Sequence, residues 1–549
     1  LRQVDIEDFD SDTSHQLFTA DYPTQCDAAA AAPSPPLVAA LRAAAGRDEA
    51  RFHFPGHNGG NAAPASLSQL VGPGPFAHDI PAFDDLFPHE GPLLEAQRKA
   101  AALFGSSETW FLVGGTTCGV QASIMATCSP GDTLILPRDS HFSATSAMVL
   151  SGAVPKYIMP AEYNPRWDLA SGVTTSQVER AIDEVAEADG KKAAAVLVTS
   201  PTYQGVCSNL REIGEVCHSH GVPLIVDEAH GAHFKFHREF PATALEQGAD
   251  LAVQSTHKVL CSLTQSSMLH MSTNGGGINH LVDRERLRRC LRTLQSTSPS
   301  PLLLASLDAT RAQLSDGDPE TIFDEAVGLA ARARDRLKGI PGISVLGAGA
   351  STNIFSGFPV LDPLRLTVRV SELGLSGFEA ADMLEQQHRI ANELAGARTV
   401  TYALGLGTRR EDVERLVSGF KHLSASFLLT GKNCNFIINK KNNFIINKNN
   451  SFILNDQGPG VFADILTRVS PREAFFAKKM RKVEIWRSAG EVCGELICPY
   501  PPGIPVLAPG EIITEGAIEY LLGLRDSGAV ISGATDHQLS SIIVLCDQL

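Results

Sequence analysis

The sequence lacks the features that mark several large classes of protein. No run of about 18 apolar residues occurs in the 549-residue chain, which argues against a transmembrane helix. The N-terminal segment LRQVDIEDFDSDTSHQ has no apolar core of the kind found in secretory signal peptides. An excess of basic residues is also missing, because the net charge is −15, and this argues against nucleic acid or an anionic membrane as a partner.

Cysteine is present but not in functional spacings. None of the eleven cysteines belongs to a CxxC pair or shows the spacing of a metal site. We therefore expect reduced, mostly buried thiols and no bound metal. We also expect a cytoplasmic protein, and leave a plastid or another organelle open because the chain does not begin with Met.

The pattern of apolar residues predicts an α/β architecture. From about residue 92 to 275, strand-like runs such as TWFLV and PLIVD alternate with amphipathic helical runs. This alternation predicts a mostly parallel sheet that is covered by helices on both faces. Residues 341–425 change to the shorter strands and helices of an α+β domain.

Composition divides the chain into five parts. We predict a partly disordered N-terminal arm at 1–50, a large domain at 51–340, a small α+β domain at 341–427, a low-complexity insertion at 428–460 and a further α/β domain at 461–549. The insertion repeats Asn-Phe-Ile-Ile-Asn-Lys at 435–440 and 443–448, and Asn/Lys-rich sequence of this kind is typical of a disordered linker without a catalytic role.

A lysine behind a hydroxyl-rich loop is the most informative local feature. Lys258 follows Ser255 and His257, shortly after an apolar strand that ends in Asp227. Most lysines are solvated surface charges, so Lys258 alone is ambiguous. Together, however, these groups are typical of a site for pyridoxal 5'-phosphate (PLP). There a lysine amine forms a Schiff base with the aldehyde, hydroxyls hold the phosphate and a carboxylate keeps the pyridine nitrogen protonated.

Two further segments supply groups that such a cofactor needs. Thr116 and Thr117 lie in a Gly-rich turn between a predicted strand and helix, where backbone N–H groups can bind a phosphate. An ordinary βα turn is the alternative for this segment. His141 follows the next strand and is placed to stack on the pyridine ring, although a solvated loop histidine would have the same sequence context.

The strand that ends at Asp227 adds the remaining groups. A carboxylate at the end of the apolar run PLIVD is costly unless it has a cationic partner such as a pyridinium. Ala229 is small enough to let the ring approach, and His230 is placed to hydrogen-bond the phenolate oxygen. Because these groups fall in order at successive strand ends, the sequence predicts one PLP site beyond the carboxyl ends of the strands.

The motifs resemble those of the ornithine/lysine/arginine decarboxylases, a fold-type-I PLP-dependent family with the aspartate-aminotransferase fold. The matching segments are FHFPGHNGG (52–60), DDLFPHEGPLLEAQ (84–97), SPTYQGVCSNL (200–210), DEAHGAHF (227–234), QSTHKVLCSLTQSSMLH (254–270), SPSPLLLASLD (298–308), SPREAFFA (470–477) and CPYPPGIPVLAPGE (498–511). The resemblance implies a short form without the N-terminal wing domain, with a C-terminal decarboxylase domain at 461–549.

The resemblance also implies a reaction and a set of roles. The reaction is decarboxylation of a basic L-amino acid to CO2 and the corresponding amine, feeding polyamine synthesis, with arginine favoured over lysine or ornithine. Lys258 becomes the Schiff-base residue, Asp227 the partner of the pyridine nitrogen and His141 the stacking group. The groups near the phosphate are Thr116, Thr117, Ser255 and His257. A homodimer or higher homo-oligomer is expected, with residues 296–301 as a candidate contribution from the neighbour.

Some positions depart from the family pattern, and other functions stay open. Asn58 replaces the lysine of the family's PGHKGG motif, and the order around His89 is altered. Another fold-type-I reaction such as transamination is one alternative, because Arg365 or Arg369 is available to bind an α-carboxylate. A non-catalytic regulatory homologue is another. For the substrate side chain, Glu495 and Glu511 are candidate partners.

Overall fold

The computed structural model describes residues 34–546, apart from 48–49, 81–84, 89, 191, 273–280, 317, 319, 348–354, 356–357, 359, 431–437, 440–443, 446–461, 463, 501 and 527. Residues 1–33 of the N-terminal arm, His89 and most of the 428–460 insertion therefore lie outside the described residues. The expected disorder of the arm and the insertion stays a prediction. Within the insertion, β14 (Ile438–Asn439) pairs antiparallel with β15 (Phe444–Ile445).

A seven-stranded sheet forms the centre of the fold and confirms the predicted α/β architecture. Its order is β1 (Glu108–Leu112), β9 (Ser267–Met271), β8 (Leu251–Gln254), β7 (Leu224–Asp227), β6 (Ala195–Thr199), β2 (Thr133–Pro137) and β3 (Val154–Ile158). The neighbours from β8 to β3 pair in parallel, whereas β9 is antiparallel to both β8 and β1. The antiparallel strand β9 has no counterpart among the strands that the sequence predicts.

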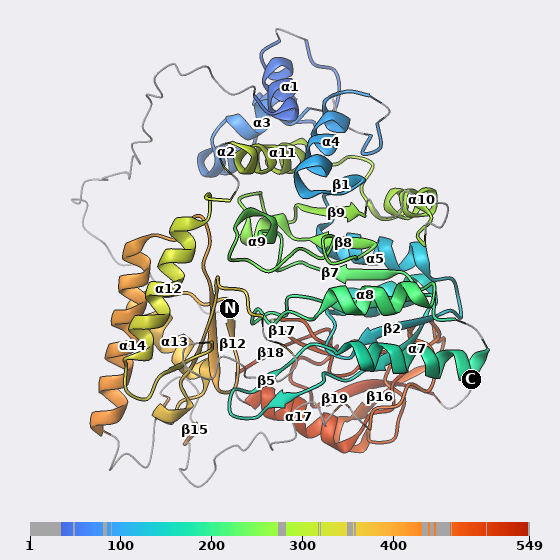
Figure 1. Cartoon of the computed structure of the whole chain (residues 1–549), viewed down its shortest axis with the longest axis vertical. Helices are drawn as coiled ribbons and strands as arrows, with labels where there is room; N and C mark the ends of the chain where they lie inside the picture. Colours follow the sequence, from blue (N-terminus) through green and yellow to red (C-terminus); the bar gives the residue numbers. More distant parts are fainter. Residues whose placement is uncertain are drawn as a thin grey trace, which may run out of the picture. The chain divides into compact units, whose positions relative to one another are not determined.

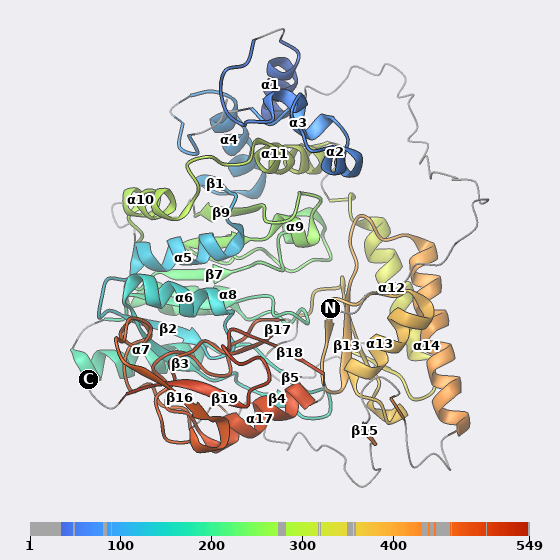
Figure 2. The ribbon, with the colours of Figure 1, turned by 180° about the vertical axis from the view of Figure 1, so that it is seen from behind.

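Helices cover both faces of this sheet, as the alternation of apolar runs predicts. One face packs against α5 (Gly115–Thr127) and α6 (Phe142–Ser151), and the other against α7 (Thr175–Asp189) and α8 (Leu210–Ser219) (Figures 1 and 2). Successive residues of β7 point to opposite faces. Ile225 therefore joins the apolar cluster that contains the α5 and α6 side chains, while Val226 joins the cluster of α7 and α8.

A layer of helices packs beside β1 at one edge of the sheet. It contains α1 (Pro36–Ala45), α4 (Pro92–Phe104) and α11 (Pro301–Ser315), which contact one another. Each of these helices has Pro at its first position. An N–H group at this position would have no hydrogen-bond partner within the helix, so proline costs no hydrogen bond there. The Asp308 carboxylate of α11 accepts a hydrogen bond of 2.8 Å from the backbone N–H of Leu37. The neighbouring elements are η1 (Asn58–Gly60), α2 (Ala65–Val71), α3 (Gly74–Ala77) and α10 (Arg284–Leu294).

Residues 324–430 form a second sheet with its own helices. The strand order is β10 (Ser344–Val345), β11 (Arg365–Arg369), β13 (Thr399–Ala403) and β12 (Leu394–Ala395), and every pair is antiparallel. The helices are α12 (Asp324–Lys338), α13 (Gly377–His388) and α14 (Arg410–Thr430), with the short helix η4 (Ser371–Leu373). Ser376 and Glu379 form a capping box that begins α13.

The C-terminal region has a separate apolar core that includes Ile497, Leu521 and Val544. Its elements are α16 (Pro471–Phe475), β16 (Met480–Glu484), η5 (Ile485–Arg487), β17 (Cys498–Tyr500), α17 (Glu515–Asp526), β18 (Val530–Ser532) and β19 (Ser541–Leu545). The first strand, β16, pairs with the last, β19, and β17 pairs with β18. Helix α16 packs against α6, and Arg138, the residue after β2, donates to the carbonyls of Pro505 and Val506, so this region lies beside the carboxyl end of β2.

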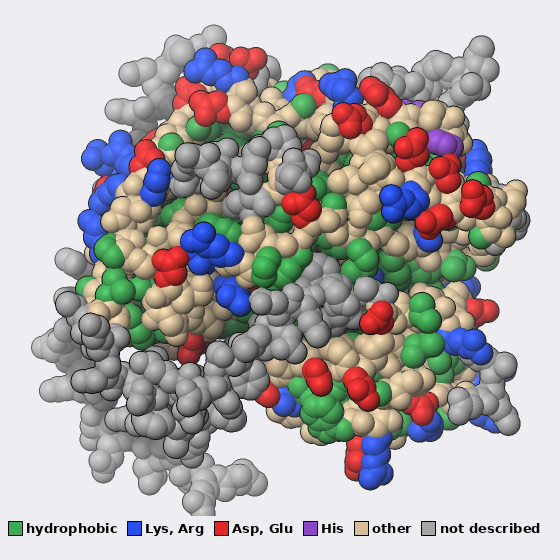
Figure 3. All heavy atoms as spheres, turned by 60° about the horizontal axis from the view of Figure 1, so that its bottom comes forward, with side chains coloured by type: hydrophobic (Ala, Val, Ile, Leu, Met, Phe, Trp, Pro, Cys, Tyr) green, Lys and Arg blue, Asp and Glu red, His purple; other side chains and the backbone are tan. Residues whose placement is uncertain are grey.

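The surface carries charges of both signs. Acidic and basic side chains are interspersed on the face shown in Figure 3. In the described part of the chain, no helix is long and apolar enough to cross a membrane.

Candidate active site

The site is built where β7 and β8 end. Lys258 lies in the short helix α9 (Thr256–Val259), directly after β8, and Asp227 is the last residue of β7. The loop after β7 brings His230 to Lys258, with 3.0 Å between His230 Nε2 and Lys258 Nζ. The sequence predicts this lysine, acid and histidine. In the structure they follow or end two adjacent parallel strands, and they meet beyond the carboxyl ends of these strands.

Arg365, the first residue of β11, also reaches this centre. Its guanidinium lies 3.0 Å from Nδ1 of His230. Because an arginine can only donate, Nδ1 must accept, and the single proton of a neutral imidazole is then on Nε2. That N–H group points at Lys258, which can accept it only as an uncharged amine. The contacts thus favour the nucleophilic form of Lys258.

The electrostatics agree with this assignment. Burial lowers the pKa of Lys258, and the Arg365 charge lowers it further, against the opposing effects of Asp227 and Glu393. Burial also lowers the pKa of His230 well below its usual value, and the positive charges of Lys258 and Arg365 act in the same direction. Both nitrogen bases are therefore held towards their neutral forms.

Asp227 is a buried carboxylate with few partners. It is 5% exposed, and one of its oxygens accepts a hydrogen bond of 3.2 Å from the backbone N–H of Ala229. Burial raises the pKa of Asp227, while the nearby charge of Lys258 opposes this effect. A buried carboxyl group of this kind fits a cationic partner such as a protonated pyridine nitrogen.

Hydroxyl groups gather at the N-terminus of α5. The Thr116 hydroxyl hydrogen-bonds the Ser255 hydroxyl, and it lies 3.1 Å from the hydroxyl of Ser267. No side chain caps this helix, whose first-turn N–H groups are thus open to an anion. A Cβ atom on Gly119 would lie 2.4 Å from Val253, so glycine is required for α5 to pack this close to β8. The cluster fits a phosphate group.

His141 is the N-terminal cap of α6, and its Nδ1 accepts a hydrogen bond from the backbone N–H of Ser143. The ring is also covered from the C-terminal region, because the Gly503 carbonyl accepts from the Phe142 N–H at 2.9 Å. A Cβ atom on Gly503 would lie 3.3 Å from His141 Nε2. Burial lowers the pKa of His141 to about 4, and the charge of Lys258 contributes. The imidazole is therefore neutral and suited to stacking on a ring.

Two predicted cofactor ligands are less tightly linked to this centre. The His257 Nδ1 atom lies 2.7 Å from the carbonyl of Ser266, which directs that ring nitrogen to the loop. Thr117 lies beside Thr116 in the first turn of α5. Asn58 has a φ of 50°, in the left-handed region that asparagine adopts more readily than lysine does.

Other groups at the site were not predicted from the sequence. Ser267 begins β9, the strand that the periodicity does not predict. Tyr203 packs edge-on against His230, with 5.0 Å between ring centroids. Nothing in the local sequence distinguishes either residue from an ordinary strand or loop residue. Their proximity depends on the crossing of distant segments.

The two glutamates suggested for the substrate side chain both have partners within the protein, and Oε1 of Glu511 has no hydrogen-bond partner among the described residues. Glu511 pairs with Arg138 at 3.0 Å, and both side chains are buried. Glu495 accepts hydrogen bonds from the backbone N–H groups of Thr535 and Ile543. Glu495 thus connects segments within the C-terminal region, and Glu511 connects this region to Arg138, the residue after β2.

Comparisons with known proteins agree along most of the chain. The model of the Orn/Lys/Arg decarboxylase major domain matches residues 35–412, and that of the C-terminal domain of the same family matches 463–536. The chain is 34% identical to the arginine decarboxylase of Bacillus subtilis (strain 168), covering 93% of this chain and 98% of that protein. It is 32% identical to the arginine decarboxylase of Bacillus anthracis, covering 93% and 97%.

More distant relatives have the same fold. The lysine decarboxylase LdcA of Pseudomonas aeruginosa is 24% identical, covering 89% of this chain and 75% of that protein. The crystal structure of the Francisella novicida lysine decarboxylase LdcF superposes with a TM-score of 0.79 at 22% identity, covering 93% of this chain and 81% of that one. The fold is thus that of the fold-type-I decarboxylases. On the two family matches and the Bacillus relatives together, this chain belongs to the Orn/Lys/Arg decarboxylase family.

Proposed function

We propose that this protein binds PLP and decarboxylates a basic L-amino acid, with arginine favoured over lysine or ornithine. The observation that carries the proposal is the Lys258–His230–Arg365 chain of contacts, in which both steps measure 3.0 Å. It holds a buried lysine towards its uncharged form beside a buried acid, and a family of PLP-dependent decarboxylases supplies the chemical context.

Each part of the cofactor has a matching group in the described chain. Lys258 would hold the aldehyde carbon, Asp227 the pyridine nitrogen, and His141 one face of the ring. Thr116 and Ser255, together with the open N-terminus of α5, would hold the phosphate. Thr117 and His257 are also proposed as phosphate ligands, because Thr117 follows Thr116 and His257 lies between Thr256 and Lys258. His230 faces Lys258 and would hydrogen-bond the phenolate oxygen of PLP beside that lysine.

When bound, PLP supplies an electron-withdrawing ring that accepts the electron pair left as the α-carboxylate departs as CO2. The chain's own residues prepare and complete this reaction. Asp227, buried and anionic, favours a protonated ring nitrogen. Arg365, whose Nε atom lies 3.8 Å from the Asp362 carboxylate but has no hydrogen-bond partner among the described residues, would orient a carboxylate of the substrate. Lys258 can hold a proton at Nζ and return it to the α-carbon.

The comparisons favour arginine as the substrate. Bacillus relatives named arginine decarboxylase are 32–34% identical to this chain, whereas relatives named lysine decarboxylase are 22–24% identical. Transamination would instead release a keto acid and retain the carboxylate, so the reaction product separates the two functions.

The decisive experiment incubates the purified protein with PLP and arginine, lysine or ornithine, and measures CO2 and amine. We expect agmatine from arginine, and loss of product in Lys258→Ala. Borohydride reduction and peptide mapping should attach the cofactor to Lys258. A cofactor attached at another lysine, or no amine from any of the three substrates, would overturn the proposal.

We also propose that the enzyme is a homodimer. The segment that carries the Pro55–Gly60 motif exposes large apolar side chains: Phe52 is 97% exposed, Phe54 85% and Leu70 80%. Apolar surface of this size is typical of a protein interface. Light scattering on the purified holoenzyme measures the mass directly, and Phe54→Ser should shift the equilibrium towards the monomer.

A further inference from the structure

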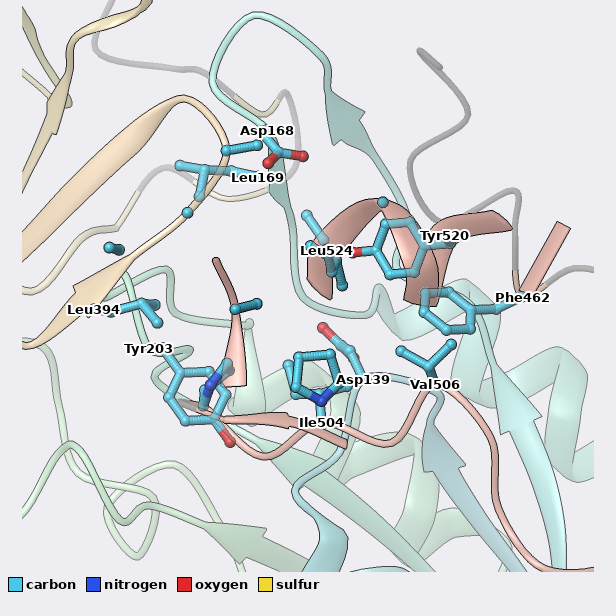
Figure 4. Close-up of a pocket in the computed structure, with 18 of the residues that line it drawn as sticks. Asp139, Asp168, Leu169, Tyr203, Leu394, Phe462, Ile504, Val506, Tyr520 and Leu524 are labelled. Carbon is cyan, nitrogen blue, oxygen red and sulfur yellow. The ribbon is translucent and has the colours of Figure 1, made fainter. Parts of the chain in front are cut away.

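A cavity of about 540 Å³ lies between the large sheet, the second sheet and the C-terminal region. Its size falls within the range of about 300–1,000 Å³ that is usual for small-molecule sites. Figure 4 shows Tyr203 and Leu394 on one side of it and Phe462 and Tyr520 on the other. The roles assigned so far leave this cavity without an occupant.

Asp139 is a partly buried carboxyl group on the wall of this cavity, and no other side chain donates a hydrogen bond to it in the described part of the chain. Figure 4 shows it directed into the space. Among the described residues, its only hydrogen-bond donor is its own backbone N–H, and the adjacent Arg138 is engaged with Glu511. Burial raises the pKa of Asp139 to about 6. The group is still largely ionised at neutral pH, and a bound cation would favour that form.

The other charged groups on the cavity wall are already satisfied or exposed. Asp168 accepts a hydrogen bond of 2.5 Å from the Tyr163 hydroxyl. Asp526 pairs with Arg525 at 2.7 Å, and Glu519 is exposed to solvent. Among the described residues of this wall, Asp139 is thus a carboxyl group without an ion-pair contact, and the nearby charge of Arg138 offsets its own charge only in part.

Three segments connect the cavity to the Lys258 centre. The loop after β2 carries Asp139 into the cavity and, two residues on, His141 beside Lys258. Tyr203 lines the cavity and packs against His230. Leu394 lines it as well, and the preceding residue, Glu393, acts electrostatically on Lys258. The cavity therefore adjoins the place where the α-carbon of a substrate would react.

The walls suit a cation on an alkyl chain. Tyr203, Phe462, Trp486 and Tyr520 offer aromatic faces and edges, and the remaining lining residues are largely apolar. Aromatic rings attract guanidinium and ammonium groups, while apolar walls accept the methylene groups between the two ends of a basic amino acid.

We propose that this cavity binds the distal cation of the substrate side chain, with Asp139 as its carboxylate partner. The inference rests on the proposed function and names the residue that would select a basic amino acid. In this arrangement the α-amino and α-carboxylate groups lie at Lys258, and the guanidinium of arginine forms charged hydrogen bonds with Asp139.

The test compares arginine with citrulline, whose ureido group has a similar shape but no charge. The wild-type holoenzyme should prefer arginine strongly. In Asp139→Asn we expect kcat/KM for arginine to fall about 100-fold, as for loss of one partner of a buried charge pair, with little change for citrulline. Lysine and norleucine replace this substrate pair if lysine is the better substrate.

Two controls separate binding from folding. Asp139→Asn should bind PLP with an unchanged absorption spectrum, and Asp139→Ser gives a smaller side chain if the amide disturbs the loop. Glu187→Gln removes a charge from the exposed surface of α7 and should leave both substrates unaffected. Inhibition by agmatine should weaken with Asp139→Asn in the same proportion as the kcat/KM for arginine.

If Asp139→Asn and Asp139→Ser both keep the wild-type ratio of kcat/KM for arginine to kcat/KM for citrulline, this inference is overturned and the proposed function is left intact. Weaker agmatine inhibition with an unchanged ratio would also overturn it, since the cavity would then bind amines apart from the reaction. Failure of the wild type to release CO2 from any basic amino acid would instead contradict the proposed function.

Discussion

Two buried ionic sites lie beyond the carboxyl ends of β2 and β7, two strands of the large sheet that are separated by β6, and they differ in how completely their cations are engaged. Beyond β2, Arg138 donates to the Glu511 carboxylate and to the carbonyls of Pro505 and Val506, at 2.7–3.0 Å. Beyond β7, Asp227 accepts one backbone N–H, and Lys258 faces a histidine that must donate to it. The cation of the first site is engaged by the protein itself, although Oε1 of Glu511 has no hydrogen-bond partner among the described residues.

The difference separates a structural charge pair from a reactive one. A buried arginine that donates to three oxygen acceptors holds the C-terminal region against the large sheet. The Lys258 centre keeps an acid of raised pKa beside an amine of lowered pKa, which is typical of a catalytic site. The two sites differ in how the cation is held: Arg138 donates to a carboxylate and to two carbonyl groups, whereas Lys258 faces a histidine.

Breaking the Arg138–Glu511 pair should have the largest effect on stability. Arg138→Met leaves Glu511 buried without its partner, and we expect the free energy of unfolding to fall by about 3–5 kcal/mol. Urea denaturation measures this change. The double variant Arg138→Met with Glu511→Leu should recover most of the loss. If the double variant were as unstable as the single one, the pair would not be the origin of the effect.

Removing the charge of Asp227 should affect activity instead. Asp227→Asn keeps the shape but loses the anion, and we expect kcat to fall by about 10²–10³-fold. Its unfolding midpoint should not fall, because a buried carboxylate with few partners is costly to the fold.

The adjacent Glu228 provides the matched control. It accepts hydrogen bonds of 2.8 Å from the Ala244 N–H and the Gln254 side chain, and burial raises its pKa to about 8. Glu228→Gln should lower the unfolding midpoint and keep kcat within a few-fold of the wild-type value. If Asp227→Asn lowered the unfolding midpoint and Glu228→Gln lowered kcat, the assignment of Asp227 to reactivity and of Glu228 to stability would be wrong.

Arg365→Met should shift the pH dependence of cofactor binding. Loss of this positive charge raises the pKa of Lys258, so a higher pH is needed to populate the uncharged amine. The pH midpoint for PLP capture by the apoenzyme should rise by about one unit. Arg369→Met is the control on the same strand, since Arg369 pairs with Glu372. A midpoint that stays constant would exclude a role of Arg365 in tuning Lys258.

The smallest effect is expected at an exposed pair. Lys99 and Glu95 lie 2.8 Å apart on the surface of α4, at i and i+4 spacing. Lys99→Ala should change the free energy of unfolding by about 0.3–0.5 kcal/mol and leave activity unchanged. An effect as large as that of Arg138→Met would contradict the argument that solvent screening makes exposed pairs weak.

The fold was largely predictable because its signals are local. Short, largely apolar runs of four or five residues specify β2, β6, β7 and β8 without reference to distant segments. Strand β9 was missed, and its antiparallel pairing with both β8 and β1 depends on contacts that no local pattern encodes. The candidate site followed the same rule. Asp227 and Lys258 lie at strand ends that the sequence reveals.

The residues that tune the site were harder to predict. Arg365 is 135 positions from His230 in the chain, and only long-range packing brings the first residue of β11 to the loop after β7. For the same reason Glu511 appears available in the sequence, although its partner is 373 positions away. Sequence therefore indicates which side chains can react, while long-range packing decides which of them are left unsatisfied.

The contact of Gly503 with His141 has a consequence for biosynthesis. The C-terminal region cannot close its β16–β19 pair until residues 541–545 have been translated, and it is this region that covers His141. Because translation runs from the N-terminus, the central sheet emerges from the ribosome long before the wall of the ring site exists. The wall beside His141 is therefore completed only after β19 has been synthesised, and a chain truncated before β19 would leave His141 uncovered on this side.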